Sequence, residues 1–347
     1  MPVHEIDPIR DPRWPAFLKR HPEASIFHTP EWLHALQRTY AYQPVVYTTT
    51  PPGHPLANGI AFCRIASRLT GKRLVSMPFT DHCQPLVHEP SALSELCCGL
   101  QHTSDQMPWK YVELRPLDAA SLKLPEVFHI SKSSVLHTLN LSSDCGKIFQ
   151  NFHKSCVQRR IRHAEREHLT YEVGRSEALL AKFYGLQLVM RQKHQLPPQP
   201  IAWFRHLIDC LGEHLTIRVA SKDAKPVASI ITLSYKQTTI YKYGCSDPAH
   251  YRLSGIIALL WQAIQAAKQN GAVQFDMGRS ECHQTGLLRF KDRWGASRSC
   301  LTYYRYPQAA GGMREEGWQM RLGRQVFARM PERLLMATGK LLYKHIG

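Results

Sequence analysis

The first part of the chain begins with a capped amphipathic helix and continues as short strands. A helix is predicted over residues 29–40, because Thr29 can cap it, Pro30 suits its first turn and apolar residues then recur at helical spacing. Four runs rich in β-branched and aromatic residues predict strands, and a helix at 92–102 precedes the last. These runs are residues 45–49, 60–65, 73–77 and 111–115. A module of mixed strands and flanking helices is expected.

The second part repeats this kind of module with more helices. Apolar periodicity predicts helices at 149–167, 176–193, 201–211 and 254–270, the first of them strongly basic. Strands are predicted at 215–221, 227–235, 238–245 and after Gly271, which ends the last helix. The order loosely repeats that of the first half. We therefore expect two related domains, residues 1–148 and 149–307, followed by a tail at 308–347.

Residues 274–295 concentrate ionisable side chains where a predicted strand turns into a short helix. Phe275 and Met277 alternate with polar neighbours as in a half-buried strand, while Asp276, Arg279 and Lys291 surround a glycine-containing turn. Charges placed at the end of a strand favour an anion-handling site. A strand followed by a solvated basic helix explains the same pattern, and charge alone does not separate the two.

Composition indicates the class of partner. The 347 residues are enough for two ordinary domains, and 44 Lys and Arg against 27 Asp and Glu leave a net charge of +17. Such an excess favours phosphorylated or polyanionic partners, including nucleotide-linked substrates, nucleic acid and anionic membrane surfaces. Charge that only keeps the protein soluble is the alternative.

The cysteines and histidines suggest neither a disulfide framework nor a metal site. The ten cysteines are scattered, and the close pair Cys97 and Cys98 is adjacent and badly placed for bridging. The 19 histidines form no zinc-type spacing with cysteine or glutamate, so no metal is expected. The N-terminus lacks the apolar run of a signal peptide, and no apolar stretch reaches membrane-spanning length. A reducing, cytoplasmic environment is expected.

A series of motifs between residues 25 and 306 resembles the FemAB-like branch of the GNAT acyltransferase superfamily. The motifs are FHTPEWLHAL, HKSCVQRRIRHAERE, FYGLQLVMRQKHQLPPQPIAWF, YKYGCS and FDMGRS…GLLRFKDRWGA. The resemblance implies an α/β (α+β) fold of two tandem GNAT-like domains, each a mixed, mostly antiparallel sheet flanked by helices. Characterised members of the branch transfer an amino acid from aminoacyl-tRNA to an amine of a nucleotide- or lipid-linked cell-wall precursor. The expected function is transfer of an acyl or aminoacyl group to an amine of a phosphorylated cell-envelope or polysaccharide precursor.

The charged turn supplies the first catalytic candidates. Acyl transfer needs a positioned amine, a place for its proton and support for the developing oxyanion, and none of these requires a metal. Lys291 matches the family's FK lysine and could hold a substrate phosphate or stabilise that charge, with Arg279 as a second cation. Exposed ion pairs with Asp276 or Asp292 are the alternative. Asp276 could act as a base. It could equally well be an ion-paired carboxylate that orients the loop.

Two residue pairs add further candidates. Asp81 and His82 follow an apolar strand, where they could receive the acceptor's proton or bind its amine. A local turn hydrogen bond beside a solvent-facing histidine explains them equally well. Tyr241 and Tyr243 share a face of their strand by parity, with Lys242 opposite, so one could enter the core and the other reach the substrate.

The donor stays open between acyl-CoA and aminoacyl-tRNA, neither of them tightly bound. The glycine-rich loop that holds CoA pyrophosphate in GNAT enzymes is reduced here to Arg252 and Gly255. The coiled-coil arm of tRNA-using relatives is also missing from the sequence. Arg160 lies on the predicted basic helix. It could belong to a solvent-exposed face, or it could bind a precursor pyrophosphate or a tRNA backbone. Of these two ligands, we rank the pyrophosphate above nucleic acid.

The tail alternates apolar residues with arginines and lysines and is interrupted at Pro331. Its apolar residues are Trp318, Leu322, Val326, Phe327, Met330, Leu334, Leu335, Leu341 and Leu342. Such a helix could lie on the anionic inner face of a membrane, or it could pack on the core as an extra helix. For the whole chain, the alternative to an enzyme is a non-catalytic protein of the same fold that binds an anionic glycan or nucleotide without turnover.

Overall fold

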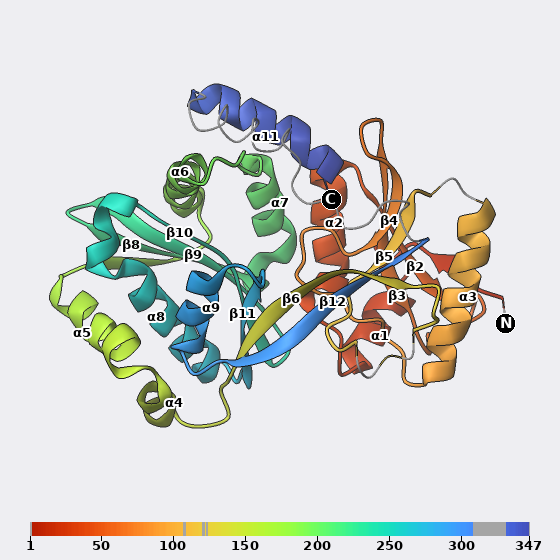
Figure 1. Ribbon diagram of the computed structural model, residues 1–347, viewed down its shortest axis with the longest axis horizontal. Coiled ribbons are helices and arrows are strands. Elements are labelled where there is room, and N and C mark those ends of the chain that lie inside the picture. The colour runs from red at the N-terminus through yellow and green to blue at the C-terminus, as the bar shows by residue number, and fades with distance from the viewer. Residues whose placement is uncertain (1, 107–108, 120–121, 123, 308–330, 347) are drawn as a thin grey trace. The chain divides into compact units, whose positions relative to one another are not determined.

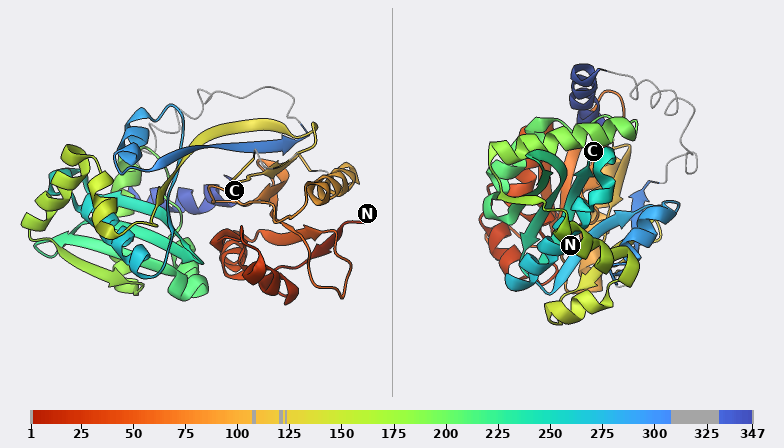
Figure 2. Two further views of the ribbon diagram at one scale, coloured as in Figure 1. Left: turned by 90° about the horizontal axis from the view of Figure 1, so that it is seen from below. Right: turned by 90° about the vertical axis from the view of Figure 1, so that its left-hand side faces the viewer.

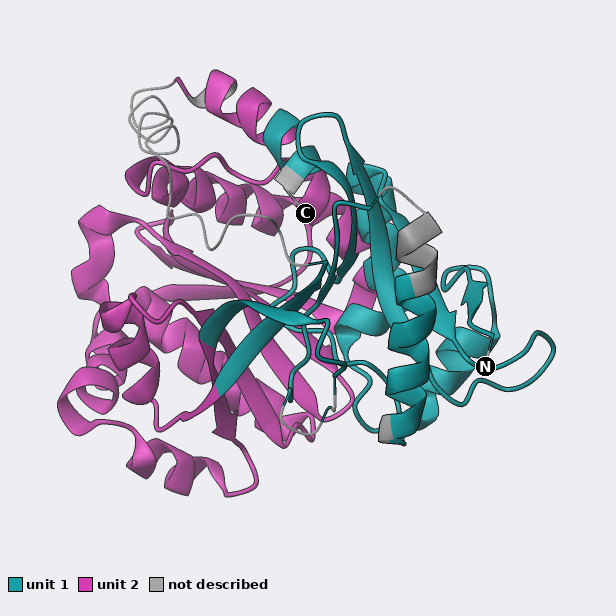
Figure 3. Cartoon of the chain, turned by 45° about the vertical axis from the view of Figure 1, so that its right-hand side comes forward, with its two compact units in different colours: residues 1–134, 300–315, 341–347 teal, residues 135–299, 316–340 magenta. Residues whose placement is uncertain are grey.

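The chain forms two compact units, coloured separately in Figure 3. The computed structural model describes residues 2–106, 109–119, 122, 124–307 and 331–346. Unit 1 consists of Met1–Ser134, Cys300–Glu315 and Leu341–Gly347, and unit 2 of Val135–Ser299 and Glu316–Lys340. The sequence predicted domains at 1–148 and 149–307, followed by a tail from 308. This division stays a prediction.

Unit 1 is built on mostly antiparallel strands (Figure 1). They are β1 (His4–Ile6), β2 (Gln43–Thr48), β3 (Ile60–Ser67), β4 (Gly71–Ser76), β5 (Tyr111–Leu114) and most of β12 (Ser297–Tyr306). Each of the first three pairs antiparallel with the next, and β12 pairs antiparallel with β5. The helix α3 (Pro90–Gln106) connects β4 to β5, so these two strands run parallel.

The predicted capped helix of unit 1 is confirmed as α2 (Pro30–Tyr40). Its N-cap Thr29 accepts a hydrogen bond from the amide of Trp32 at 3.3 Å, and Pro30 occupies the first turn. Shorter helices, α1 (Arg13–Arg20) and η1 (Ile26–His28), precede it. On the α3 side of the strands, leucines of the helix pack against aliphatic and aromatic strand residues in one buried cluster. The α2 helix itself buries Trp32, Leu33, Ala35, Leu36 and Tyr40.

Unit 2 has the same kind of sheet. Its strands are the second part of β6 (His129–Asn140), β7 (Thr170–Gly174), β8 (Leu215–Lys222), β9 (Lys225–Tyr235), β10 (Thr238–Ser246) and β11 (Gln274–Ser280). Strands β7 to β10 pair antiparallel in turn, and β11 pairs antiparallel with β6. The helix α8 (Gly255–Gln269) connects β10 to β11, which run parallel.

Helices cover both faces of the unit 2 strands, with α6 (Glu177–Lys193) on one side and α8 on the other (Figures 1 and 2). The α7 helix (Ile201–Leu211) contacts α6. The predicted basic helix at 149–167 is wrong as a single element. The chain instead forms α4 (Cys145–Asn151), a π-helical turn η2 (Lys154–Gln158) and α5 (Arg159–Arg166), because His153 caps a new start by accepting from the amide of Cys156.

The two units repeat one strand order. In sheet order, unit 1 runs β1, β2, β3, β4, β5, β12 and unit 2 runs β7, β8, β9, β10, β11, β6. In each, a helix crosses over between the fourth and fifth strands and produces a parallel pair. The sixth strand of unit 1 follows all the unit 2 strands in the sequence, whereas the sixth strand of unit 2 precedes its other strands. The sequence pattern had not predicted β6 or β12.

The described part of the tail is α11 (Glu332–Ile346), which passes from unit 2 into unit 1 at Leu341. Leu335 is buried, and Leu334 is exposed. Within unit 1 the carbonyl of His345 accepts hydrogen bonds from Thr70 at 2.9 Å and Arg73 at 2.7 Å. This end of the tail therefore packs on protein. The apolar residues expected between Trp318 and Met330 lie outside the described residues.

Candidate functional site

The fourth and fifth strands of unit 2 separate soon after they begin to pair. The parallel ladder of β10 and β11 ends with the pair Ile240 and Asp276, and the described structure shows no further ladder between these strands. Each strand is bulged next to this point, β10 between Tyr241 and Tyr243 and β11 between Asp276 and Arg279. A bulge bends its strand and re-aims the side chains that follow. The facing edges of the two strands therefore diverge where the predicted site residues lie.

The bulge in β10 corrects the expected placement of the two tyrosines. Tyr241 packs with the buried cluster that includes α8, whereas the hydroxyl of Tyr243 accepts a hydrogen bond from Trp203 of α7 at 2.9 Å. The prediction that both share a face by parity is wrong, because the extra residue in the bulge inverts the alternation. Burial raises the pKa of Tyr241, so its phenol is neutral at physiological pH.

The start of α8 faces this divergence and has an unusual cap. A 3-10 turn, η4 (Pro248–Leu253), leads to Ser254, which has a φ of 58° and does not cap the helix with its side chain. At Gly255 an added Cβ would come within 3.0 Å of the Ala228 side chain on β9. Glycine thus lets the first turn of α8 lie directly against the sheet. The N–H groups of such a helix start form an anion-binding site.

Cationic side chains surround this helix start. Arg160 of α5 donates from Nε to the Ser254 hydroxyl at 3.1 Å and from its guanidinium to the Tyr251 carbonyl at 3.1 Å. Lys193, at the end of α6, lies 4.7 Å from the centre of the Tyr251 ring, and Arg252 is exposed. The structure therefore brings together Arg160, Arg252 and Gly255, which the sequence had assigned separately. Their combined charge favours a phosphate ligand.

The charged turn after β11 is organised from inside the protein. Lys291, only 3% exposed, donates to the carbonyls of Gly278 at 2.6 Å and Arg279 at 3.1 Å. Asp276, also 3% exposed, accepts from the amide of Gly278 at 2.6 Å. Gly278 has a φ of 76°, a conformation that glycine adopts without strain. Asp276 and Lys291 therefore hold the bulge in shape, and the expected exposed ion pair of Lys291 is not what forms.

Further ion pairs lie beside this turn. Arg279 pairs with Glu281 at 3.3 Å. Asp292 pairs with Arg298 and accepts a hydrogen bond from Nε2 of His137 on β6 at 3.2 Å. His137 is fully buried, and burial lowers its pKa. Sequence reasoning missed His137, although its position in the alternating run VLHTLNL could have predicted an inward-facing residue.

Asp81 and His82 lie together in a loop of unit 1 after β4. The Asp81 carbonyl accepts from the Tyr303 hydroxyl at 2.6 Å, and the His82 ring is packed edge-on to Phe27. His82 is 6% exposed. The alternative of a solvent-facing histidine is therefore wrong, and the catalytic role of the pair stays a prediction.

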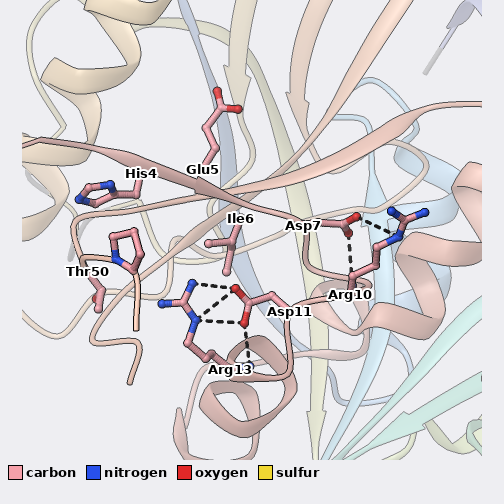
Figure 4. A pocket seen from close by; sticks show the side chains of 9 residues that line it. His4, Glu5, Ile6, Asp7, Arg10, Asp11, Arg13 and Thr50 are labelled. Atoms are coloured by element: carbon pink, nitrogen blue, oxygen red, sulfur yellow. Dashed lines mark hydrogen bonds and ion pairs between the residues drawn. The ribbon is translucent and has the colours of Figure 1, made fainter. Parts of the chain in front are cut away.

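A separate cavity of about 400 Å³ in unit 1 lies between β1, the start of α1 and the loop after β2 (Figure 4). Its charged side chains are already paired with one another. Arg13 binds Asp11 at 2.7 Å, and Arg10 lies 3.7 Å from Asp7. Glu5 pairs with Arg64 at 2.5 Å. This pairing suits a structural role for the cavity walls.

The residues of the described segments contain no group of three or more His, Cys, Asp or Glu side chains placed to hold a metal ion. None of the described helices combines the length and the apolar character needed to cross a membrane. All ten cysteines are free thiols.

Residues 151–292 match the model of the acetyltransferase (GNAT) domain family. This segment contains the start of α8, the divergence of β10 and β11, and the turn held by Lys291. The protein is therefore an acyltransferase, as its sequence motifs predicted. A search of curated proteins found no match to the sequence.

Solved structures show the same fold along most of the chain. FemX has a TM-score of 0.69 at 11% identity, with 88% of this chain and 98% of that chain covered. The C-terminal domain of a putative lysylphosphatidylglycerol synthetase from Agrobacterium fabrum has a TM-score of 0.55 at 12% identity, covering 84% and 90%. A tandem GNAT protein from the clavulanic acid biosynthesis pathway has a TM-score of 0.54 at 9% identity, covering 91% and 100%. The predicted tandem GNAT-like fold is confirmed.

Proposed function

We propose that the protein transfers an acyl or aminoacyl group to an amine of a phosphorylated cell-envelope or polysaccharide precursor. The observation that carries the proposal is the cationic start of α8, where Arg160 is bound to Ser254 inside the GNAT domain. An acyl donor with a phosphate group suits this position, because helix N–H groups and arginine both favour phosphate.

The donor that best suits the helix start is acyl-CoA, whose pyrophosphate would meet the first turn of α8 near Arg252 and Gly255. Acetyl-transferring GNAT domains use such donors, which favours acyl-CoA over aminoacyl-tRNA as the first candidate. The acyl arm would extend along the diverging edges of β10 and β11, where backbone groups beyond the ladder can hydrogen-bond to a ligand. Neither donor is expected to stay bound as a cofactor.

The residues behind β11 would act by positioning. Lys291 holds the carbonyls of Gly278 and Arg279, and Asp276 holds the Gly278 amide, so the edge of β11 has a fixed shape. A fixed edge can hold the acyl carbonyl in place for attack by the amine. Arg279 lies at the outer end of this strand and is the candidate contact for an acceptor phosphate. Tyr243, held by Trp203, is a further candidate for substrate binding.

The acceptor side would involve unit 1, where Asp81 is the candidate to take the amine proton and His82 supports its loop. The similar Agrobacterium fabrum structure is named for a lipid product, and FemX shares the fold, which together favour an envelope precursor, amino-sugar or lipid-linked. Such precursors and both donors occur in the cytoplasm, so we propose a cytoplasmic enzyme. RNA recognition ranks lower than phosphate binding.

The test is a donor and acceptor panel with purified full-length protein. Acyl-CoA and charged-tRNA donors are each combined with nucleotide- and lipid-linked amino sugars, and product mass is followed for wild type and for Arg160→Gln. Loss of the hydrogen bonds to the start of α8 should raise the KM for acyl-CoA about tenfold, the effect of one charge-assisted bond. The matched control is Arg159→Gln, which removes a neighbouring exposed charge on the same helix.

The outcomes separate the alternatives. Equal KM values for Arg160→Gln and Arg159→Gln would remove the start of α8 from donor binding. Product with charged tRNA alone would reassign the donor. Ligand binding without product from any donor would favour the non-catalytic alternative for an anionic glycan or nucleotide.

A further inference from the structure

A second cavity in unit 1 has a volume of about 460 Å³, and neither Asp81 nor His82 lines it. It is lined by the end of α2, the start of β2, the β3–β4 hairpin and the end of α11. The residues that matter for its chemistry are Tyr42, Arg64, Lys72, Trp109 and Lys344. The cavity therefore combines aromatic walls with three cations.

Its lysines carry charge that the protein does not neutralise. Arg64 is paired with Glu5, but within the described part of the chain neither Lys72 nor Lys344 has an ion-pair partner. No acidic residue lines this cavity in the described structure. The indole Nε1 of Trp109 also lacks a hydrogen-bond partner among the described residues. Such a cavity favours a ligand that has a phosphate and hydrogen-bond acceptors.

Two large apolar side chains stand exposed at the same end of unit 1. Leu69, at the tip of the β3–β4 hairpin, is 71% exposed, and Leu341 of α11 is 63% exposed. The hairpin and the end of α11 are joined, because Ser67 bonds to the His345 ring at 2.9 Å and Thr70 bonds to its carbonyl (Figure 1). Leu341 precedes His345 by one turn and so lies on the same face of α11.

The two segments that form this end of unit 1 are basic. The chain from residue 64 to residue 80 contains four arginines and lysines and no Asp or Glu, and from residue 334 onward α11 contains only basic charges. Exposed leucines next to lysines are the arrangement by which proteins insert at the surface of an anionic bilayer.

We infer that this end of unit 1 is a docking surface for an anionic membrane, with one phospholipid headgroup phosphate bound in the cavity by Lys72 and Lys344. Leu69 and Leu341 enter the acyl boundary beside it. The inference concerns attachment to a lipid surface and stands whether or not the proposed transfer reaction is correct. A soluble phosphate ester offers the same charge but gives no reason for the two exposed leucines.

Vesicle co-sedimentation of the full-length protein tests the inference. Vesicles of phosphatidylcholine with phosphatidylglycerol are compared with phosphatidylcholine alone, at a fixed ionic strength. The variant Lys72→Gln/Lys344→Gln should bind the anionic vesicles about thirtyfold more weakly, as expected for two cations at an anionic surface. Lys19→Gln/Arg20→Gln, which removes two exposed charges of α1 outside the cavity lining, should lose much less.

A second variant leaves α11 unchanged. Leu69→Gln changes an exposed hairpin tip, leaves the charge intact and should weaken vesicle binding several-fold with unchanged thermal unfolding. Equal binding by all variants, or equal binding to both kinds of vesicle, would overturn the inference. So would binding of inorganic phosphate or glycerol 3-phosphate that depends on Lys72 and Lys344 in a protein that does not bind vesicles.

Discussion

Units 1 and 2 share one strand order and one crossover helix, yet they differ at the start of that helix. In unit 2 the loop after the fourth strand is short, ends at Gly255 and is bound by Arg160. In unit 1 a longer loop with Asp81, His82 and Glu89 precedes α3 and carries no Arg or Lys between residues 77 and 89. The same fold therefore presents a cationic helix start in one unit and an acidic loop in the other.

This difference shows which part of each unit can change its charge without changing the fold. The buried strands and helices determine the fold in both units, while the connection at the end of the fourth strand determines the local charge. Part of unit 2 matches the GNAT family model, and we propose the donor site there. Unit 1 keeps the architecture, and it has cations at the β3–β4 hairpin and at the end of α11.

The largest expected effect concerns a buried ion network in unit 1. Glu113, 2% exposed, accepts from Arg115 at 2.7 Å and from Arg305 at 2.6 Å. Glu113→Ala would leave two arginines unpaired and should cost about 3–5 kcal/mol of stability. Hydrogen exchange reports this per unit, and protection should fall around β5 and β12 and persist around β11. Equal loss in both units would mean that they unfold as one.

The same network predicts a pH dependence. Burial opposes ionisation of Glu113, but the two arginines outweigh it and hold its pKa below the ordinary value of 4.5. A lowered pKa contributes stability that is complete above the unfolded-state value and is lost as the pH falls through the folded-state value. Wild-type unit 1 should therefore lose stability in acid below about 4.5, whereas Glu113→Ala should lack this component. Glu126→Ala, at an exposed position, is the control.

An intermediate effect is expected at Lys291 in unit 2. Lys291→Met keeps the volume but leaves the carbonyls of Gly278 and Arg279 without this donor, at a cost of about 2–3 kcal/mol. Denaturant unfolding and hydrogen exchange around β11 measure the loss, and Arg289→Met on the exposed side of α9 (Thr285–Asp292) is the matched control. Unchanged stability together with lost activity would instead show that Lys291 contacts the substrate.

The smallest effect compares two glycines of unit 2. Gly255→Ala would bring a Cβ within 3.0 Å of Ala228 and should cost about 1–2 kcal/mol, with weaker donor binding. Gly286→Ala in α9 meets nothing within 4 Å and should be neutral or stabilising by up to about 1 kcal/mol. Similar stability of the two variants would contradict the close packing of α8 on β9.

The sequence predicted the parts of the fold that depend on local pattern. Thr29 and Pro30 located a helix start to within a residue, and Gly271 located the end of α8, because caps depend on neighbouring residues. The strand β6 was missed because its first half, HISKSS, is polar and mostly not buried. The burial of β6 depends on pairing with β11, which lies far along the sequence.

The candidate site was harder to predict, for a physical reason. The bulges at Tyr241 and Asp276 shift the alternation of their strands, and nothing local distinguishes a bulged strand from a regular one. Lys291 was placed at the correct turn, but its burial under the β11 carbonyls depends on the packing of α9. The charge of the site could be predicted, whereas the direction of each side chain could not.

The late position of β12 in the sequence has a consequence for how the protein is made. Unit 1 is complete only when residues 300–306 of β12 have left the ribosome, because they cover the open edge of β5. Until then that edge offers unpaired amides and carbonyls to other chains. Synthesis of nearly the whole polypeptide therefore precedes closure of its first-made unit, and truncation before residue 300 would yield an aggregation-prone product.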